Sequence, residues 1–191
     1  DVAGNSVTEA VSFTVAPTDE VAPVVTLSLA DDTGDGTDGV TADGTIVGTV
    51  TDDSEVVSLK AGFGELPVEQ YVDVTAFVQN GSFSLDKAAL EAILGEPLAD
   101  GDYTLSVVAE DAFGNISEPI SHSFTLDTQS PTLTVTELQT VDTEGGLIRL
   151  LGSVDEPSVV TVSLAGQDDI TFAVTAAGDF EQALQLVPTE V

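Results

Sequence analysis

The sequence predicts an all-β protein built from tandem antiparallel β-sandwiches, with one short helix near residues 87–94. Apolar and β-branched residues recur in short runs, and turns rich in glycine, aspartate and threonine separate these runs. A phrase of the form D-x-x-G-N occurs twice, at residues 1–5 and 111–115, each time before a strand-like run. The two copies lie 110 residues apart, which is about the length of one small β-sandwich.

This period divides the chain into three segments. Residues 1–17 are expected to form the closing strand of a preceding domain, residues 18–129 a complete domain, and residues 130–191 an incomplete following domain. The last segment is expected to lack about two strands, which would leave an unstable or sticky edge. We therefore expect residues 1–15 of one copy to lie against residues 131–191 of another, or the chain to be a segment of a longer polymer.

In the complete domain, apolar runs predict strands at residues 24–29, 45–50, 56–61, 71–78, 81–85, 103–109 and 120–126. Residues 31–44 are rich in glycine and aspartate and are expected to form a loop. Tyr103 follows the turn Asp100-Gly101-Asp102 and begins an alternating strand. That position is typical of the tyrosine corner, in which a tyrosine hydroxyl bonds back to the main chain.

One helix is predicted before the strand that carries Tyr103. Asp86 is a good N-cap, residues 87–94 carry alanine and leucine at helical spacing, and Gly95 suits the position after the helix. A helix of about two turns is stable only if it packs on the sandwich. In the incomplete domain, the first strands are expected to repeat at residues 132–135, 147–154 and 159–164.

The chain is strongly acidic, with 34 Asp and Glu residues against 3 Lys and Arg residues and a net charge of −31. Nucleic acid and anionic membranes are therefore poor partners, and no nucleic-acid binding is expected, because little in the chain could neutralise phosphate. Divalent cations are the natural counter-ions. The chain has no cysteine, which excludes disulfides and thiolate zinc sites. No membrane insertion is expected, because no run of about 18 apolar residues occurs.

Clustered oxygen atoms are the strongest candidates for binding chemistry. Calcium takes about six to eight oxygen ligands and tolerates irregular geometry, whereas magnesium demands a tighter octahedron. The loop at residues 31–44 offers carboxylates and four glycines that allow tight turns. Its expected calcium ligands are Asp31, Asp32, Asp35 and Asp38, with Asp43 close by. The spacing is not that of an EF-hand loop, because the final bidentate glutamate is missing.

A second group of acids is expected at one end of the sandwich, where loops gather. Its members follow the second strand or precede the last one: Asp52, Asp53, Glu110, Asp111 and Asn115. Asp127, after the last strand, is expected at the opposite end, where it would hold a cation with acids of the adjoining domain. Two plainer interpretations stay open. An aspartate in D-x-x-G-N can simply cap a turn, and acids cluster by solvation alone in so acidic a chain.

Longer motifs extend this pattern: A-D-D-T-G-D-G-T-D-G-V-T and V-G-T-V-T-D, then L-x-D-G-x-Y-T-L-x-V-x-A-x-D-x-x-G-N and F-T-L-D-T-x-x-P. Together they resemble the immunoglobulin-like repeats of large secreted and cell-surface bacterial adhesins, including the biofilm-associated type. The resemblance covers nearly all of residues 1–191. Residues 107–111 are also distantly similar to a calcium-binding element of cadherin repeats, although the cadherin D-x-N-D-N linker is absent.

The resemblance implies a structural repeat module of an extracellular bacterial adhesin or surface filament, stiffened by calcium at loops and domain junctions. Its partners would be neighbouring repeats of the same chain or of identical chains. Any cell-surface or glycan target, and any export signal, is expected outside this sequence. The alternative is a carbohydrate-binding or accessory module of a secreted enzyme or phage fibre. An exposed aromatic patch would favour that alternative, and aromatic residues make up 5% of the chain.

No enzymatic activity is expected. The strand-to-helix glycine motifs of nucleotide-binding enzymes and the G-x-S-x-G motif of hydrolases are absent from the sequence. The one histidine, His122, lies in a strand between two serines and is expected to face solvent rather than to act as a base or ligand.

Overall fold

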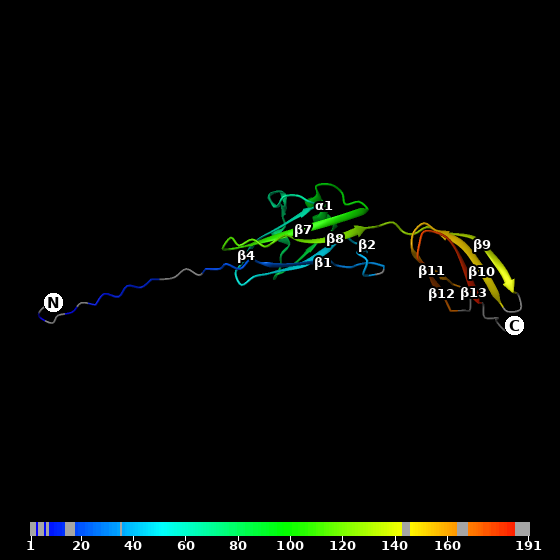
Figure 1. Ribbon diagram of the computed structural model, residues 1–191, viewed down its shortest axis with the longest axis horizontal. Helices are drawn as coiled ribbons and strands as arrows, with labels where there is room; N and C mark the ends of the chain where they lie inside the picture. Colours follow the sequence, from blue (N-terminus) through cyan, green and yellow to red (C-terminus); the bar gives the residue numbers. More distant parts are fainter. Residues whose placement is uncertain are drawn as a thin grey trace. The chain divides into compact units, whose positions relative to one another are not determined.

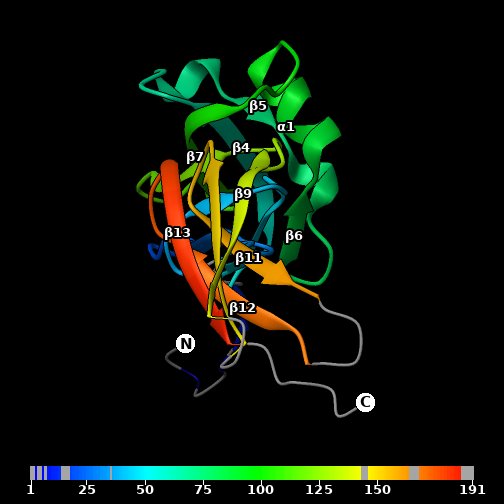
Figure 2. The same cartoon turned by 90° about the vertical axis from the view of Figure 1, so that its right-hand side faces the viewer.

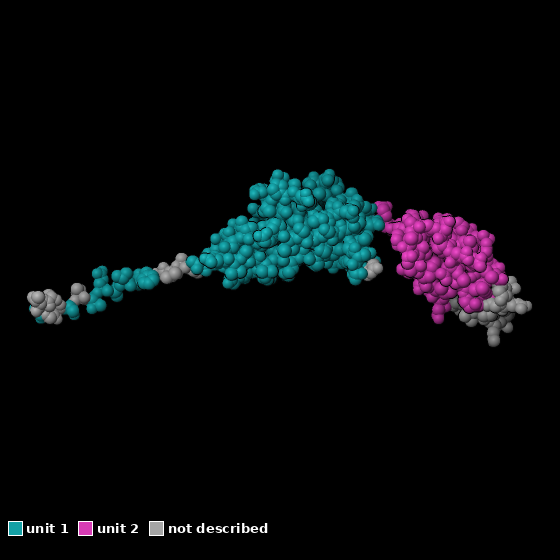
Figure 3. All heavy atoms as spheres, viewed as in Figure 1, with its two compact units in different colours: residues 1–128 teal, residues 129–191 magenta. Residues whose placement is uncertain are grey.

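The computed structural model describes residues 3, 6, 8–13, 18–34, 36–142, 146–163 and 168–185. The chain forms two compact units, Asp1–Thr128 and Gln129–Val191 (Figure 3). Within the described residues, no helix has both the length and the apolar character needed to cross a membrane.

The first unit is a sandwich of two sheets (Figure 1). One sheet has the order β1-β3-β6, formed by Val24–Leu29, Ile46–Thr51 and Ser82–Leu85. The other has the order β2-β8-β7-β4-β5, formed by Val40–Thr41, Ile120–Leu126, Gly101–Asp111, Val56–Phe63 and Val72–Asp73. The strands pair antiparallel, except that β2 runs parallel to β8. The predicted all-β sandwich is therefore confirmed.

Side chains of the inner faces fill the space between the two sheets. Ile46, Leu59 and Leu105 are each 0% exposed. Alternation along β7 places Leu105, Val107 and Ala109 inside and the intervening residues on the outer face. On β8 the same alternation places His122 on the face of the buried Phe124. The prediction that His122 faces solvent is therefore wrong: its Nε2 atom is buried and has no hydrogen-bond partner among the described residues.

The predicted helix is confirmed as α1, Lys87–Leu94. The Asp86 carboxylate accepts a hydrogen bond from the Ala89 main-chain N–H at 2.9 Å, and Gly95 ends the helix at a φ of 82°. Leu90, which is 0% exposed, joins the core. Figure 2 shows α1 beside β4 and β6, so that packing on the sandwich stabilises this short helix.

The tyrosine corner is also confirmed. The Tyr103 hydroxyl donates a hydrogen bond to the Ala99 carbonyl oxygen at 2.8 Å. The ring lies between two core aromatics, with centroid distances of 5.6 Å to Phe63 and 5.6 Å to Phe124. This contact fixes the turn that leads into β7.

Replacing Tyr103 with phenylalanine is expected to lower the free energy of unfolding by about 1 kcal/mol, because it removes one hydrogen bond and keeps the ring. Urea denaturation measures the change. Tyr71→Phe is the matched control, since no hydrogen bond of the Tyr71 hydroxyl occurs within the described part of the chain. Equal changes in both variants would contradict the corner's role.

The strand predicted over residues 71–78 is wrong. Its place is taken by the two-residue β5 between two short 3-10 helices, Val68–Gln70 and Thr75–Phe77. The Asp73 carboxylate accepts a hydrogen bond from the Thr75 main-chain N–H at 2.9 Å, and the Thr75 hydroxyl accepts one from the Leu59 N–H at 2.8 Å. These local side-chain bonds turn the backbone away from an extended course.

The second unit repeats the first sheet. Its β9, β10 and β13, at Leu133–Asp142, Leu147–Val154 and Gly178–Gln185, pair in the order β13-β10-β9. A two-stranded sheet adds β11, Ser158–Val162, and β12, Ile170–Val174. The last of these was not predicted. Ile148, Leu150 and Leu184 form the buried cluster of this unit.

A glycine packs against a phenylalanine ring at the same place in both units. In the first unit, a β-carbon on Gly48 of β3 would overlap the Thr26 carbonyl oxygen and the Phe83 ring. In the second unit, a β-carbon on Gly152 of β10 would lie 2.5 Å from the Thr134 oxygen and 2.7 Å from the Phe180 ring. The two units therefore share a packing motif as well as a strand order.

The first segment of the chain shows no strand where the structure describes it. Residues 8–13 lie outside any strand, and the side chains of Val11 and Phe13 are 82% and 84% exposed. A strand forms only when a partner satisfies its main-chain hydrogen bonds. The assignment of residues 1–17 to a preceding domain stays a prediction, as does the incompleteness of residues 130–191.

Candidate cation site

The first unit has an entry end and an exit end. At the entry end, residues 18–23 lead into β1, and β1 begins opposite the end of β3, with Val24 paired to Thr51. At the exit end, β8 stops beside the start of β7, with Leu126 paired to Gly101. The chain therefore runs into the sandwich at one end and out at the other.

Asp111 organises the loops of the entry end. It is 1% exposed, and its Oδ1 accepts hydrogen bonds from the main-chain N–H groups of Phe113 at 2.9 Å and Asn115 at 2.7 Å. Its Oδ2 accepts from Asn115 Nδ2 at 2.7 Å and, at 3.2 Å, shares the single hydroxyl hydrogen of Ser54 with Asp52 Oδ1. Burial raises the pKa of Asp111, but these hydrogen bonds outweigh it, so the pKa lies below its ordinary value. Asp111 is thus a buried turn cap.

Asn115 links the segment that enters the first unit to the loop that Asp111 holds. Its Nδ2 also donates to the Asp19 carbonyl oxygen at 3.1 Å. The carboxylates of Asp19, Asp52 and Asp53 then converge, with one oxygen of each lying within 4.8 Å of the others. Ser54 helps to orient this group, because its hydroxyl donates to Asp52 Oδ1 at 2.7 Å. Two loops and the entering segment therefore meet at one acidic cluster, which we call the entry cluster.

The entry cluster is electrostatically strained. The negative charge of Asp19, together with contact between the two carboxyl groups, raises the pKa of Asp53 above its ordinary value, and Asp52 adds to the effect. Asp19 Oδ1 accepts from the Val21 N–H at 2.9 Å. Its Oδ2 is buried and has no hydrogen-bond partner among the described residues. A buried, unpartnered carboxylate oxygen is unfavourable unless a cation or a proton satisfies it.

The donor set of the entry cluster fits calcium. It consists of carboxylate oxygens from the entering segment and from the loop between β3 and β4, and calcium accepts such irregular sets of oxygen ligands. Asp19, Asp52 and Asp53 are the residues that would hold the ion. Asp111 and Asn115 support them through hydrogen bonds rather than as free ligands.

The structure places the residues predicted for the entry end in different surroundings. Asp52 and Asp53 join the entry cluster, and Glu110 does not. Neighbouring residues of a strand point to opposite faces, so Glu110 lies on the outer face of β7 beside Ser58 and Lys60, while Asp111 is buried. Sequence reasoning missed Asp19, although its junction Asp19 to Pro23 matches the junction Asp127 to Pro131.

The loop at residues 31–44 shows a different arrangement. Asp35 lies outside the described residues. Asp38 Oδ1 caps its own turn by accepting from the Val40 N–H at 3.0 Å, and Asp32 Oδ2 accepts from the Gly39 N–H at 3.1 Å. Asp31 contributes its carbonyl oxygen, which accepts from the Thr41 hydroxyl at 2.8 Å. No three carboxylates converge in the described part of this loop, so a cation site here stays a prediction.

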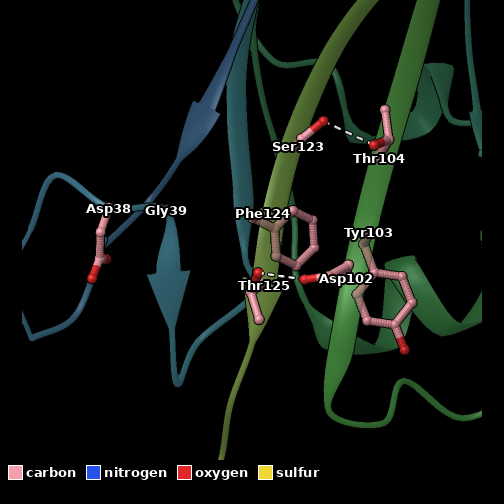
Figure 4. Close-up of a pocket in the computed structure, with 8 residues that line it drawn as sticks. All are labelled: Asp38, Gly39, Asp102, Tyr103, Thr104, Ser123, Phe124 and Thr125. Carbon is pink, nitrogen blue, oxygen red and sulfur yellow. Dashed lines mark hydrogen bonds between the residues drawn. The ribbon is translucent and has the colours of Figure 1, made fainter. Parts of the chain in front are cut away.

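Asp127 lies at the exit end, as predicted. Its main-chain N–H donates to the Thr41 carbonyl oxygen at 2.9 Å. An open groove of about 330 Å³ lies nearby and is lined by Asp38, Gly39, Asp102, Tyr103, Thr104, Ser123, Phe124 and Thr125 (Figure 4). The threonine and serine hydroxyl groups that line it bond one another or a carboxylate: Thr104 pairs with Ser123 at 2.8 Å, and Thr125 donates to Asp102 at 2.6 Å.

Comparison with known proteins identifies the first unit. A family model described as bacterial Ig-like domain matches residues 18–128. No curated protein matches this sequence. Among solved structures, the crystal structure of dimeric latent PorU from Porphyromonas gingivalis matches with 14% identity and a TM-score of 0.42, over 87% of this chain and 17% of that chain. The match thus spans a small part of PorU, and at this score it bears on neither fold nor function.

Proposed function

This chain belongs to the bacterial Ig-like domain family, and from this premise we propose that it is a structural repeat module of an extracellular bacterial adhesin or surface filament. One observation carries the proposal. The chain enters the first unit beside Asn115 and leaves it beside Thr41, at opposite ends of the sandwich. Such a module extends a chain by its own length, which is what a spacer between a cell and a distant binding site requires.

We further propose that the entry cluster binds calcium. Bound there, the ion would supply positive charge between Asp19, Asp52 and Asp53. Asp19 belongs to the entering segment, whereas Asp52 and Asp53 belong to the loop between β3 and β4. The carboxylates would therefore hold the segment against the end of the domain and limit its bending. The buried, unpartnered Oδ2 of Asp19 supports this proposal most directly.

Calcium is expected to raise the melting temperature of the 191-residue protein relative to the same protein in chelator. At a calcium concentration about tenfold above Kd, binding to the folded state alone adds about 1.4 kcal/mol of stability. Differential scanning calorimetry at fixed ionic strength measures the shift, with magnesium as the comparison ion. An unchanged melting temperature across the calcium titration would contradict the proposal that the entry cluster binds calcium.

Two variants locate the effect. Asp19→Asn is expected to lose most of the calcium response, since it removes one charge of the entry cluster. Asp43→Asn is the matched control: Asp43 is an exposed turn cap that accepts from the Thr45 N–H at 3.0 Å, and asparagine can still accept that bond. A calcium response that persists in Asp19→Asn, or is lost equally in both variants, would place the ion elsewhere.

The extracellular role has its own test. An antibody raised against this protein is expected to label the surface of intact cells that carry the gene. A cytoplasmic protein released on lysis serves as the control for cell integrity. Labelling that requires lysis would exclude the adhesin or filament role without bearing on calcium binding.

A further inference from the structure

Strand β9 of the second unit has an exposed apolar face. Leu133, Val135 and Leu138 are 46%, 55% and 61% exposed. They pair directly with residues of β10 that point into the unit, among them the buried Leu150 and Val154. Directly paired residues of an antiparallel ladder lie on the same face of the sheet, so these three side chains belong to the inner face. We call Leu133, Val135 and Leu138 the β9 face.

The first unit covers the equivalent face. Gly48 and Gly152 are equivalent, because each packs against a phenylalanine ring from the neighbouring strand. Counted from these glycines, Val25, Leu27 and Leu29 of β1 take the places of the β9 face. Val25 is 6% exposed, and the other two pack against the core. Strands β8 and β7 of the facing sheet lie beside β1 (Figure 1). In the described part of the second unit, the facing sheet holds only β11 and β12.

The segment before the first unit has the sequence of such a covering strand. Residues 11–15 read Val-Ser-Phe-Thr-Val, and residues 122–126 of β8 read His-Ser-Phe-Thr-Leu. In β8, Phe124 is 4% exposed, whereas Val11 and Phe13 are 82% and 84% exposed. Residues two apart in an extended chain point the same way, so Val11 and Phe13 can enter one apolar surface together. We call residues 11–13 the donor segment.

We propose that the donor segment of one copy of this protein covers the β9 face of a second copy. Both surfaces are apolar, and removing apolar area from water stabilises association. The main chain of the donor segment also has a place to pair. Within the described residues, β11 pairs with β12 alone, and an extended segment can add a strand to such an open sheet edge.

The pairing joins different copies and has a direction. The donor segment precedes the entry end of the first unit, whereas the second unit follows its exit end. Each copy therefore offers one donor segment and one β9 face, which are different surfaces. An interface between two different surfaces leaves one of each free in a pair, so association continues into chains or rings of copies. The inference goes beyond the proposed spacer role and requires neither calcium nor an extracellular location.

Analytical ultracentrifugation of the 191-residue protein in chelator tests the proposal. At about 0.15 M salt, repulsion between the acidic copies is screened beyond about 8 Å, and the mean mass is expected to rise with concentration above that of one chain. Phe13→Asp is expected to weaken association by about 10- to 100-fold, the effect of losing the burial of one large apolar side chain. Phe13 is exposed and lies outside any strand, so both units of this variant are expected to stay folded.

A complementary pair of variants tests the direction of the contact. Leu138→Asp is expected to abolish association by changing the β9 face, and circular dichroism verifies that it folds. An equal mixture of Phe13→Asp and Leu138→Asp is expected to associate again but to stop at two copies, because only one intact donor segment meets one intact β9 face. Val57→Asp is the matched control, since Val57 is an apolar residue of β4 with 47% exposure, and it is expected to leave association unchanged.

Three results would overturn the proposal. The first is the mass of a single chain at every concentration. The second is association that is lost in Leu138→Asp but unchanged in Phe13→Asp, which would show that the β9 faces of two copies cover each other. The third is an equal loss in Val57→Asp, which would show general apolar aggregation. None of these results bears on calcium binding or on the cell-surface location, which have their own tests.

Discussion

Replacing Asp111 with alanine is expected to lower the melting temperature of the first unit by an amount on the order of 10 °C. The substitution leaves the N–H groups of Phe113 and Asn115 and the Asn115 side chain without their acceptor in a nearly buried place. It also releases Ser54, which orients Asp52. Calorimetry in chelator measures the loss of the turn apart from any effect on calcium.

The same variant has a pH signature. The folded-state pKa of Asp111 is lowered, so this carboxylate stabilises the fold above its ordinary pKa. That contribution disappears as the pH falls through the folded value. The wild-type protein should therefore lose stability below about pH 4, and Asp111→Ala should lose less there. Asp73→Ala is the control for the size of the loss in melting temperature: Asp73 is exposed, and hydrogen bonds from Thr75 and the charge of Lys60 lower its pKa in the same direction. A comparable fall in melting temperature for both variants would contradict the role of Asp111 in holding the loops of the entry end.

Replacing Gly48 with alanine is expected to lower the free energy of unfolding by about 3 kcal/mol, the upper part of the range for overpacked cores. The added methyl group overlaps the Thr26 carbonyl oxygen, which belongs to a paired strand and cannot move without breaking the ladder. It also overlaps Phe83, which is 4% exposed. Chemical denaturation followed by circular dichroism measures the change.

Gly64→Ala is the matched control for Gly48. Gly64 has a φ of 69° and nothing within 4 Å of an added β-carbon, so alanine there introduces only backbone strain of about 1–2 kcal/mol. Combining Gly48→Ala with Phe83→Leu is expected to recover part of the loss, because the smaller side chain relieves one of the two overlaps. Equal effects of Gly48→Ala and Gly64→Ala would show that steric overlap does not set the stability.

The helix and most strands of the first unit follow closely from the sequence, because their signals are local. The two-residue strand β2, Val40–Thr41, is an exception, since residues 31–44 are expected to form a loop throughout. Alternation predicts β1, β3, β4 and β8, and capping residues predict both ends of α1. The strand predicted over residues 71–78 is wrong because the interactions that decide its structure are not local. It has the composition of a strand, but hydrogen bonds from Asp73 and Thr75 redirect it, and that competition depends on where Leu59 lies.

The candidate site was predictable only in part. Topology predicts that the loops containing Asp52 and Asp111 meet, and the structure brings them together through Ser54. Asp19 enters through a hydrogen bond from Asn115 that spans 96 positions of the sequence, which no local pattern encodes. The acids of residues 31–44 behave differently. They lie close together in the sequence, and this spacing favours hydrogen bonds from nearby main-chain N–H groups over a site where several carboxylates meet.

The passage of the chain through the first unit also determines how much length the unit can release. Folded, the segment from Val24 to Leu126 connects two ends of one small sandwich. Unfolded and extended, its roughly 100 residues reach roughly 350 Å. A single unfolding event would therefore lengthen the tether severalfold without breaking a covalent bond. Refolding would then recover that length, so the domain would lengthen and shorten reversibly under load.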